Sequence, residues 1–221
     1  MIPLSDVSRR PCSFPIINVL LITANVVVFT LELALGDAFI NRWVFVPAHL
    51  VAGRDWITVV TAMFMHGGWL HIGGNMLFLW VFGPEIEDVM GPVRYLLFYL
   101  LGGIISTVAQ VTADPTSVIP NLGASGAIAA VMGAFLITYP RDQIRTVLFI
   151  GWFVRITFVP AVLLVGLWIL VQVVSQVGVV TQDDVGGGVA YMAHIGGFVF
   201  GAITARLFEV RGPRNCPASD F

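Results

Sequence analysis

Long runs of uncharged residues divide the chain into six apolar segments. The uncharged stretches cover residues 11–31, 56–84, 95–113, 115–140, 156–182 and 185–205. A helix of about 20 residues crosses the roughly 30 Å hydrocarbon layer of a bilayer, and a helix satisfies its own backbone hydrogen bonds there. We therefore predict six membrane-spanning helices, over residues 14–33, 70–88, 93–113, 124–139, 158–177 and 188–207.

Composition places this pattern in a membrane rather than in a soluble core. The 221 residues are 57% hydrophobic and 11% charged, with a mean hydropathy of +0.91, which is too apolar for a soluble domain. No internal repeat is present, so we expect one all-α, polytopic bundle over residues 14–207. Residues 36–69 form its longest connection, and Trp43, Trp56 and Trp69 favour the headgroup layer. We predict an external loop half sunk in the outer leaflet.

The arginines predict how the helices are oriented. The chain has no lysine, and an even number of spans leaves both termini on one side together with nine of eleven arginines: Arg9, Arg10, Arg94, Arg141, Arg145, Arg155, Arg206, Arg211 and Arg214. The positive-inside rule makes this side cytoplasmic, so residues 1–13 and 208–221 are expected to be cytoplasmic tails. The first helix lacks a cleavage site and is expected to be retained, in a bacterial plasma membrane.

The predicted topology also suggests properties for the cysteines in the two tails and for two connecting segments. Cys12 and Cys216 lie in the predicted cytoplasmic tails, where reducing conditions favour free thiols. Residues 146–154 are apolar but too short to span, and we expect them to lie along the cytoplasmic face. Residues 183–188 contain two aspartates and three glycines, and glycine permits many backbone conformations. This external loop is expected to be mobile.

Four polar residues inside the apolar segments need an explanation, because polar groups are costly in lipid. They are His71, Asn75, Ser125 and His194. A serine between glycines is commonly a close-packing residue, and a histidine or an asparagine commonly joins two helices by a hydrogen bond. The predicted topology, however, places all four near the external ends of their helices. Their common depth favours a site.

Small residues predict which helix faces meet. Ala129 and Gly133 follow Ser125 at four-residue spacing, and Gly197 and Gly201 follow His194 at three and seven residues. Gly126, directly after the serine, is also expected to be a helix-packing residue. Faces of this kind allow two backbones to approach closely. Ser125 Oγ would then come within reach of His194, the arrangement of a nucleophile and its general base.

Two further residues predict stabilisation of a reaction intermediate. His71 and Asn75 are four apart and share one helix face, so their donors, with the amide of Ser125, could bind an oxyanion. No carboxylate lies in the spans near this level, which predicts a dyad. Nothing completes a metal set around the histidines, and no basic cluster suggests nucleic acid. We expect neither a metal nor another cofactor.

These residues lie in three stretches that resemble the rhomboid family of intramembrane serine proteases: HGGWLHIGGNMLFLWVFG from His66, GASGAIAAVMGA from Gly123 and AHIGGFVFGA from Ala193. The resemblance covers about residues 56–207 and implies a six-helix core with a water-filled cavity open to the outside. It implies Ser125 as nucleophile, His194 as base, and His71, Asn75 and the Ser125 amide as oxyanion hole. Some members stack an aromatic residue on the histidine where this chain has Ala129, so His194 needs another neighbour.

The resemblance implies an intramembrane serine endopeptidase that cuts transmembrane protein substrates within the bilayer. Two other functions are compatible with the sequence. One is a catalytically silent rhomboid-like protein that binds membrane helices, although such proteins typically lack the serine or the histidine. The other is a transporter, although no inverted halves and no buried carboxylate or arginine suggest an ion pathway. The oligomeric state is not predicted.

Overall fold

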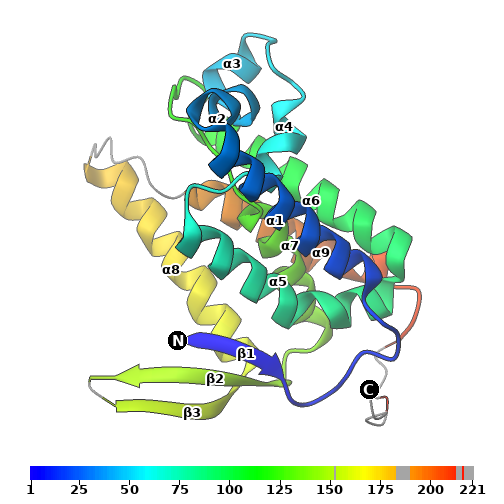
Figure 1. Ribbon diagram of the computed structural model, residues 1–221. Coiled ribbons are helices and arrows are strands. Elements are labelled where there is room, and N and C mark those ends of the chain that lie inside the picture. The colour runs from blue at the N-terminus through cyan, green and yellow to red at the C-terminus, as the bar shows by residue number, and fades with distance from the viewer. Residues whose placement is uncertain (152, 183–189, 213–215, 217–221) are drawn as a thin grey trace.

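The computed structural model describes residues 1–151, 153–182, 190–212 and 216 (Figure 1). Over these ranges, each predicted apolar segment contains a long helix. The six helices are α1 (Ile16–Leu35), α5 (Trp69–Met90), α6 (Pro92–Ala113), α7 (Ser125–Thr138), α8 (Ala161–Gln182) and α9 (Tyr191–Phe208). The predicted loop at 183–188 and the start of the sixth segment at residue 188 lie outside the described residues.

Four stretches of these helices are long and apolar enough to cross a membrane: Ile16–Leu35, Pro92–Ala113, Ala161–Gly178 and Tyr191–Phe208. The other two long helices differ from them. α7 has 14 residues, and α5 carries Glu85, Glu87 and Asp88 near its end. The chain is thus a multi-pass helical membrane protein, and the count of six spans stays a prediction.

The carboxylates at the end of α5 are explained by the start of α1. Glu87 accepts hydrogen bonds from the N–H groups of Ile17 and Asn18 at 3.0 and 2.8 Å. These amides belong to the first turn of α1 and have no partner within their own helix, and a carboxylate there also complements the helix dipole. Asn18 in turn accepts a 2.7 Å hydrogen bond from the Tyr95 hydroxyl of α6. Hydrogen bonds between buried polar groups therefore hold the start of α1, the end of α5 and the start of α6 against one another.

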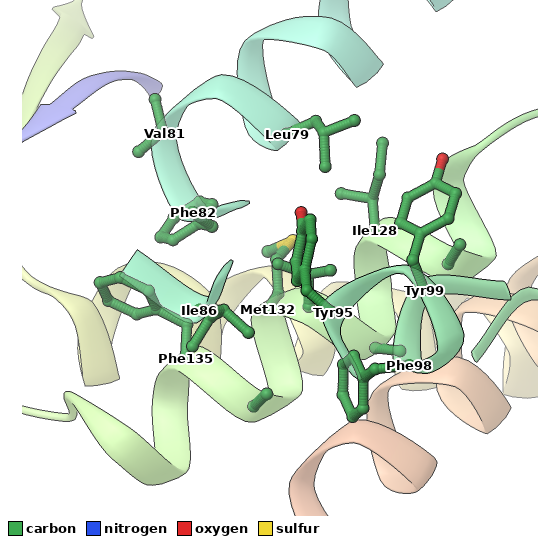
Figure 2. Packing of buried hydrophobic residues seen from close by; sticks show 14 of the residues in the cluster. Leu79, Val81, Phe82, Ile86, Tyr95, Phe98, Tyr99, Ile128, Met132 and Phe135 are labelled. Atoms are coloured by element: carbon green, nitrogen blue, oxygen red, sulfur yellow. The ribbon is translucent and has the colours of Figure 1, made fainter. Parts of the chain in front are cut away.

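α7 is the central helix and is buried along most of its length. Figure 2 shows Ile128, Met132 and Phe135 of α7 among aromatic and aliphatic side chains of α5 and α6. Phe82 meets Phe135 edge-on, with ring centroids 5.0 Å apart. α7 thus has little contact with the surroundings, and its short length suits a helix enclosed by others.

Glycines bring α7 and α9 into backbone contact. A Cβ added to Gly197 would overlap the carbonyl oxygen of Gly126, and one added to Gly201 would overlap that of Ala130. A Cβ added to Gly133 would likewise overlap the carbonyl oxygen of Phe198. The small-residue faces therefore meet, with Ala130 facing Gly201, one position after the predicted Ala129.

The all-α expectation needs a correction at the end of the molecule opposite residues 37–61 (Figure 1). A three-stranded antiparallel sheet lies there, in the order β1 (Ile2–Asp6), β2 (Gln143–Ile150) and β3 (Phe153–Pro160) (Figure 1). Residues 146–150 and 153–154, expected along the cytoplasmic face, belong to strands β2 and β3, and their position against the membrane stays a prediction. β-Branched and aromatic residues dominate both strands, as is typical of sheets, and Gly151 has a φ of +59° at the turn.

The prediction of free cysteines is wrong. Cys12 and Cys216 form a disulfide, with Cα atoms 5.4 Å apart and a sequence separation of 204. The N-terminal segment is also held by an ion pair between Arg9 and Asp142, in which Arg9 Nη2 lies 2.8 Å from Asp142 Oδ1. Only the folded chain brings the two cysteines together, so the sequence pattern could not pair them.

The long connection at residues 36–69 is folded. It contains the short helices α2 (Asp37–Trp43), α3 (Pro47–Val51), α4 (Thr58–Thr61) and the 3₁₀ turn η1 (Ala62–Phe64). In Figure 1 these lie at the end of the bundle opposite the sheet. Phe45 and Asn121 exchange two backbone hydrogen bonds, of 3.1 and 2.8 Å, which join this connection to the segment before α7.

Candidate active site

The predicted site residues lie at the N-terminal ends of three long helices. His71 and Asn75 occupy the first two turns of α5, Ser125 is the first residue of α7, and His194 lies in the first turn of α9. Helix N-terminal amides lack intrahelical partners and carry partial positive charge. Developing negative charge on a bound group would be stabilised at this place.

Ser125 and His194 are hydrogen-bonded. His194 Nε2 lies 2.7 Å from Ser125 Oγ. The close approach of Gly197 to the Gly126 backbone, one residue after the serine, permits this distance. With an acceptor nitrogen on its hydroxyl, Ser125 can pass its proton to the ring as it attacks a carbonyl carbon.

The other nitrogen of His194 meets a residue of α8 that the sequence analysis did not single out. His194 Nδ1 lies 2.8 Å from Gln172 Oε1, and Gln172 is buried. Trp168, one turn earlier on α8, lies beside the same ring, with centroids 5.6 Å apart. The sequence did offer a signal for this contact, because Gln172 is a polar residue in an uncharged span and lies four residues after Trp168. α8 thus supplies the neighbours that Ala129 does not.

The hydrogen bonds of His71 define which of its nitrogens can donate. The N–H of Gly67 donates to His71 Nδ1 at 3.3 Å, so the ring proton resides on Nε2. A Cβ added to Gly123 would lie 2.8 Å from His71 Nε2 and 3.7 Å from Ser125 Oγ. The structure therefore brings the His71 donor beside the serine.

Asn75 makes its side-chain hydrogen bond with His66. Asn75 Nδ2 lies 3.0 Å from His66 Nε2, and burial lowers the pKa of His66 to about 4, so this ring is neutral and accepts the bond. The backbone N–H of His66 donates to Glu32 of α1 at 3.0 Å. One proton of the Asn75 amide is thereby used in bracing the connection before α5.

The four predicted residues share a cavity. It has a volume of about 570 Å³ and is lined by His71, Asn75, Ser125 and His194, together with Trp168 of α8. Among the residues that the structure describes, no group of three or more His, Cys, Asp or Glu side chains could hold a metal ion.

Fold and site together define a multi-pass helical membrane protein with a serine–histidine pair in a cavity. A family model described as the rhomboid domain matches residues 53–210, which is more than half of the chain and includes all four residues. The chain belongs to the rhomboid family. The resemblance drawn from the three sequence stretches is confirmed.

Relatives in bacteria and mitochondria share parts of the sequence. Rhomboid protease GluP of Bacillus subtilis (strain 168) is 38% identical over 87 residues, 39% of this chain and 17% of that protein. Rhomboid protein 1, mitochondrial, of Saccharomyces cerevisiae is 30% identical over 115 residues, 48% and 33% of the two chains. Presenilin-associated rhomboid-like protein A, mitochondrial, of Danio rerio is 36% identical over 94 residues, 42% and 24%. The matched part is less than half the length of each relative.

Proposed function

We propose that this chain is an intramembrane serine endopeptidase that hydrolyses peptide bonds in or near transmembrane segments of other membrane proteins. The observation that carries the proposal is the 2.7 Å contact between Ser125 Oγ and His194 Nε2 in a cavity of a helical membrane protein. Membership of the rhomboid family, and a relative named as a protease, support the same function.

The first half of the proposed reaction forms an acyl-enzyme. Ser125 Oγ attacks the scissile carbonyl carbon while its proton passes to His194 Nε2. The carbonyl oxygen becomes negative and takes hydrogen bonds from His71 Nε2–H, the Asn75 amide and the Ser125 backbone N–H. The intermediate collapses as the C–N bond breaks, and His194 returns the proton to the leaving nitrogen.

The second half releases the product. Water in the cavity loses a proton to His194 Nε2 and attacks the ester carbonyl, and Ser125 regains the proton when its C–O bond breaks. A peptide bond inside a helix is hydrogen-bonded and shielded, so a substrate must unwind before Ser125 reaches its carbonyl. The need to unwind favours substrates with helix-weakening residues beyond the cut, and the resemblance to rhomboid proteases implies small residues at the cut itself.

The proposed orientation puts both termini on the cytoplasmic side of a bacterial plasma membrane and opens the cavity to the outside. The arginine distribution supports it, whereas the Cys12–Cys216 disulfide counts against it, because disulfides are rare in a reducing cytoplasm. A green fluorescent protein fused after residue 221 should fluoresce, whereas alkaline phosphatase at the same point should be inactive. The reverse pair of results would refute this orientation.

A fluorophosphonate probe tests the proposed activity. The detergent-purified chain should be labelled at Ser125, and His194→Ala should reduce the labelling rate by a factor of about 10² or more. Ser125→Ala should abolish both labelling and cleavage of a reporter transmembrane substrate. A folded wild-type protein that neither labels nor cleaves would instead indicate a silent rhomboid-like binder of membrane helices.

A further inference from the structure

Gln172 is a buried polar residue on α8, a helix of mostly apolar residues. It is 8% exposed, and its Oε1 lies 2.8 Å from Nδ1 of His194, which is also 8% exposed. A buried amide in a membrane helix is costly unless it is paired. The pairing here is with the ring that faces Ser125.

This hydrogen bond selects one tautomer of His194. A carbonyl oxygen only accepts, so Nδ1 must carry the ring proton, and Nε2 then keeps its lone pair for the Ser125 hydroxyl. The opposite orientation of the Gln172 amide would present N–H to Nδ1 and move the ring proton to Nε2. In that state the ring could not take the serine proton.

A second contact from the same helix face restricts the ring. Trp168 and Gln172 are four residues apart and lie on one face of α8, and the Trp168 ring is tilted by 42° to His194 at 5.6 Å between centroids. Within the described part of the chain, no carboxylate is hydrogen-bonded to His194. The orientation of the ring therefore depends on a neutral acceptor and an aromatic neighbour, both supplied by α8.

We propose that Gln172 is a positioning residue that holds His194 as the competent general base, so that the working unit is Ser125, His194 and Gln172. The inference rests on the proposed protease function. When Nε2 takes the serine proton, Nδ1–H still donates to Gln172 Oε1, and no proton leaves the ring toward α8. The amide therefore orients the ring and adds no full charge to the site.

The geometry has a consequence for α8. Ser125 and His194 belong to α7 and α9, which are in backbone contact through glycines, whereas Gln172 belongs to a different helix. Displacement of α8 would remove the acceptor from Nδ1 while the serine–histidine contact stayed in place. His194 can thus act as the general base only while α8 is packed in the position that brings Gln172 to Nδ1.

Substitution at Gln172 separates positioning from packing. Gln172→Leu keeps a similar volume without an acceptor, and Gln172→Glu retains an acceptor oxygen at the same reach. Gln176→Leu is the matched control, because it makes the same chemical change one turn further along α8, and the structure shows no hydrogen bond from Gln176 to His194. Each variant is compared with wild type by kcat and KM on a reporter transmembrane substrate, by fluorophosphonate labelling rate and by thermal unfolding midpoint.

The expected result is a loss confined to the chemical step. Gln172→Leu should lower kcat and the labelling rate by about 10-fold to 100-fold, a range between the loss of one hydrogen bond and the loss of the correct tautomer. KM and the unfolding midpoint should stay close to wild type. Gln172→Glu should recover at least half of the lost rate on a logarithmic scale, and Gln176→Leu should match wild type.

Two results would overturn the proposal. One is a Gln172→Leu protein with wild-type kcat and labelling rate. The other is a Gln172→Glu protein no faster than Gln172→Leu, with both unfolding at lower temperature, since a packing role predicts that pattern. If the wild type itself shows no His194-dependent labelling at Ser125, the proposed protease function fails. Normal wild-type labelling with an unaffected Gln172→Leu rejects only the role of Gln172.

Discussion

Hydrogen bonds at the residue scale assign a proton position to each histidine near the cavity. Gly67 donates to His71 Nδ1, so His71 donates through Nε2, whereas Gln172 accepts from His194 Nδ1, so His194 accepts through Nε2. His66 accepts from Asn75. The two rings beside Ser125 thus have opposite tautomers, which suits one for binding an oxyanion and the other for taking a proton.

Gly123 offers a test of the His71 donor at this scale. It has a φ of +128°, and a Cβ there would lie 2.8 Å from His71 Nε2. Gly123→Ala should lower kcat by about 100-fold, because the methyl group displaces one oxyanion donor, as measured on a reporter substrate. Gly53→Ala is the control, since Gly53 has a φ of +75° and no atom within 4 Å of the added Cβ. Equal kcat values for the two variants would contradict this role of Gly123.

At the scale of elements, the contact between α7 and α9 determines the distance between Ser125 and His194. Glycines on both helices remove the side chains that would separate the backbones. Both reactive residues lie at helix N-terminal ends, on the same side of the contact. A change in the spacing of the two helices therefore moves the nucleophile relative to its base.

Gly201 tests this contact two turns away from the chemistry. Gly201→Ala places a methyl group against the Ala130 backbone, which cannot rotate away, so the unfolding free energy should fall by about 1–3 kcal/mol and kcat should fall with it. Gly166→Ala on α8 is the matched control, because no atom lies within 4 Å of its added Cβ; its stability should be unchanged or higher by about 0.5–1 kcal/mol. Thermal unfolding in detergent measures both, and a fully stable Gly201→Ala would refute the argument.

At the scale of the whole molecule, the N-terminal segment joins the far end of the bundle. β1 pairs with β2, Arg9 forms an ion pair with Asp142, and Cys12 is bonded to Cys216. The pKa of Asp6 is raised to about 7, mainly by burial and also by the nearby Asp142 carboxylate. The hydrogen bond from the Ser8 amide lowers this pKa but does not cancel the effect of burial. The docked segment therefore has a carboxyl group that is protonated more readily than in the unfolded chain.

The raised pKa of Asp6 predicts a pH dependence of stability. The carboxyl group of an unfolded chain titrates near 4, so the folded state binds more protons between about pH 4 and 7 and loses stability as the pH rises through this window. Asp6→Asn removes this contribution. Its unfolding midpoint, relative to wild type, should therefore rise between pH 5 and pH 8. Parallel curves for the two proteins would show that Asp6 does not contribute.

The sequence by itself determined the membrane class, the helical segments and the family. Apolar runs and short polar stretches consist of residues close together along the chain, so they can be recognised without the fold. It also singled out His71, Asn75, Ser125 and His194. Only the tertiary structure decided that Gln172 meets His194 and that Cys12 meets Cys216, as well as which strands pair. Those outcomes depend on helix rotation and on contacts between distant residues, and a local pattern contains neither.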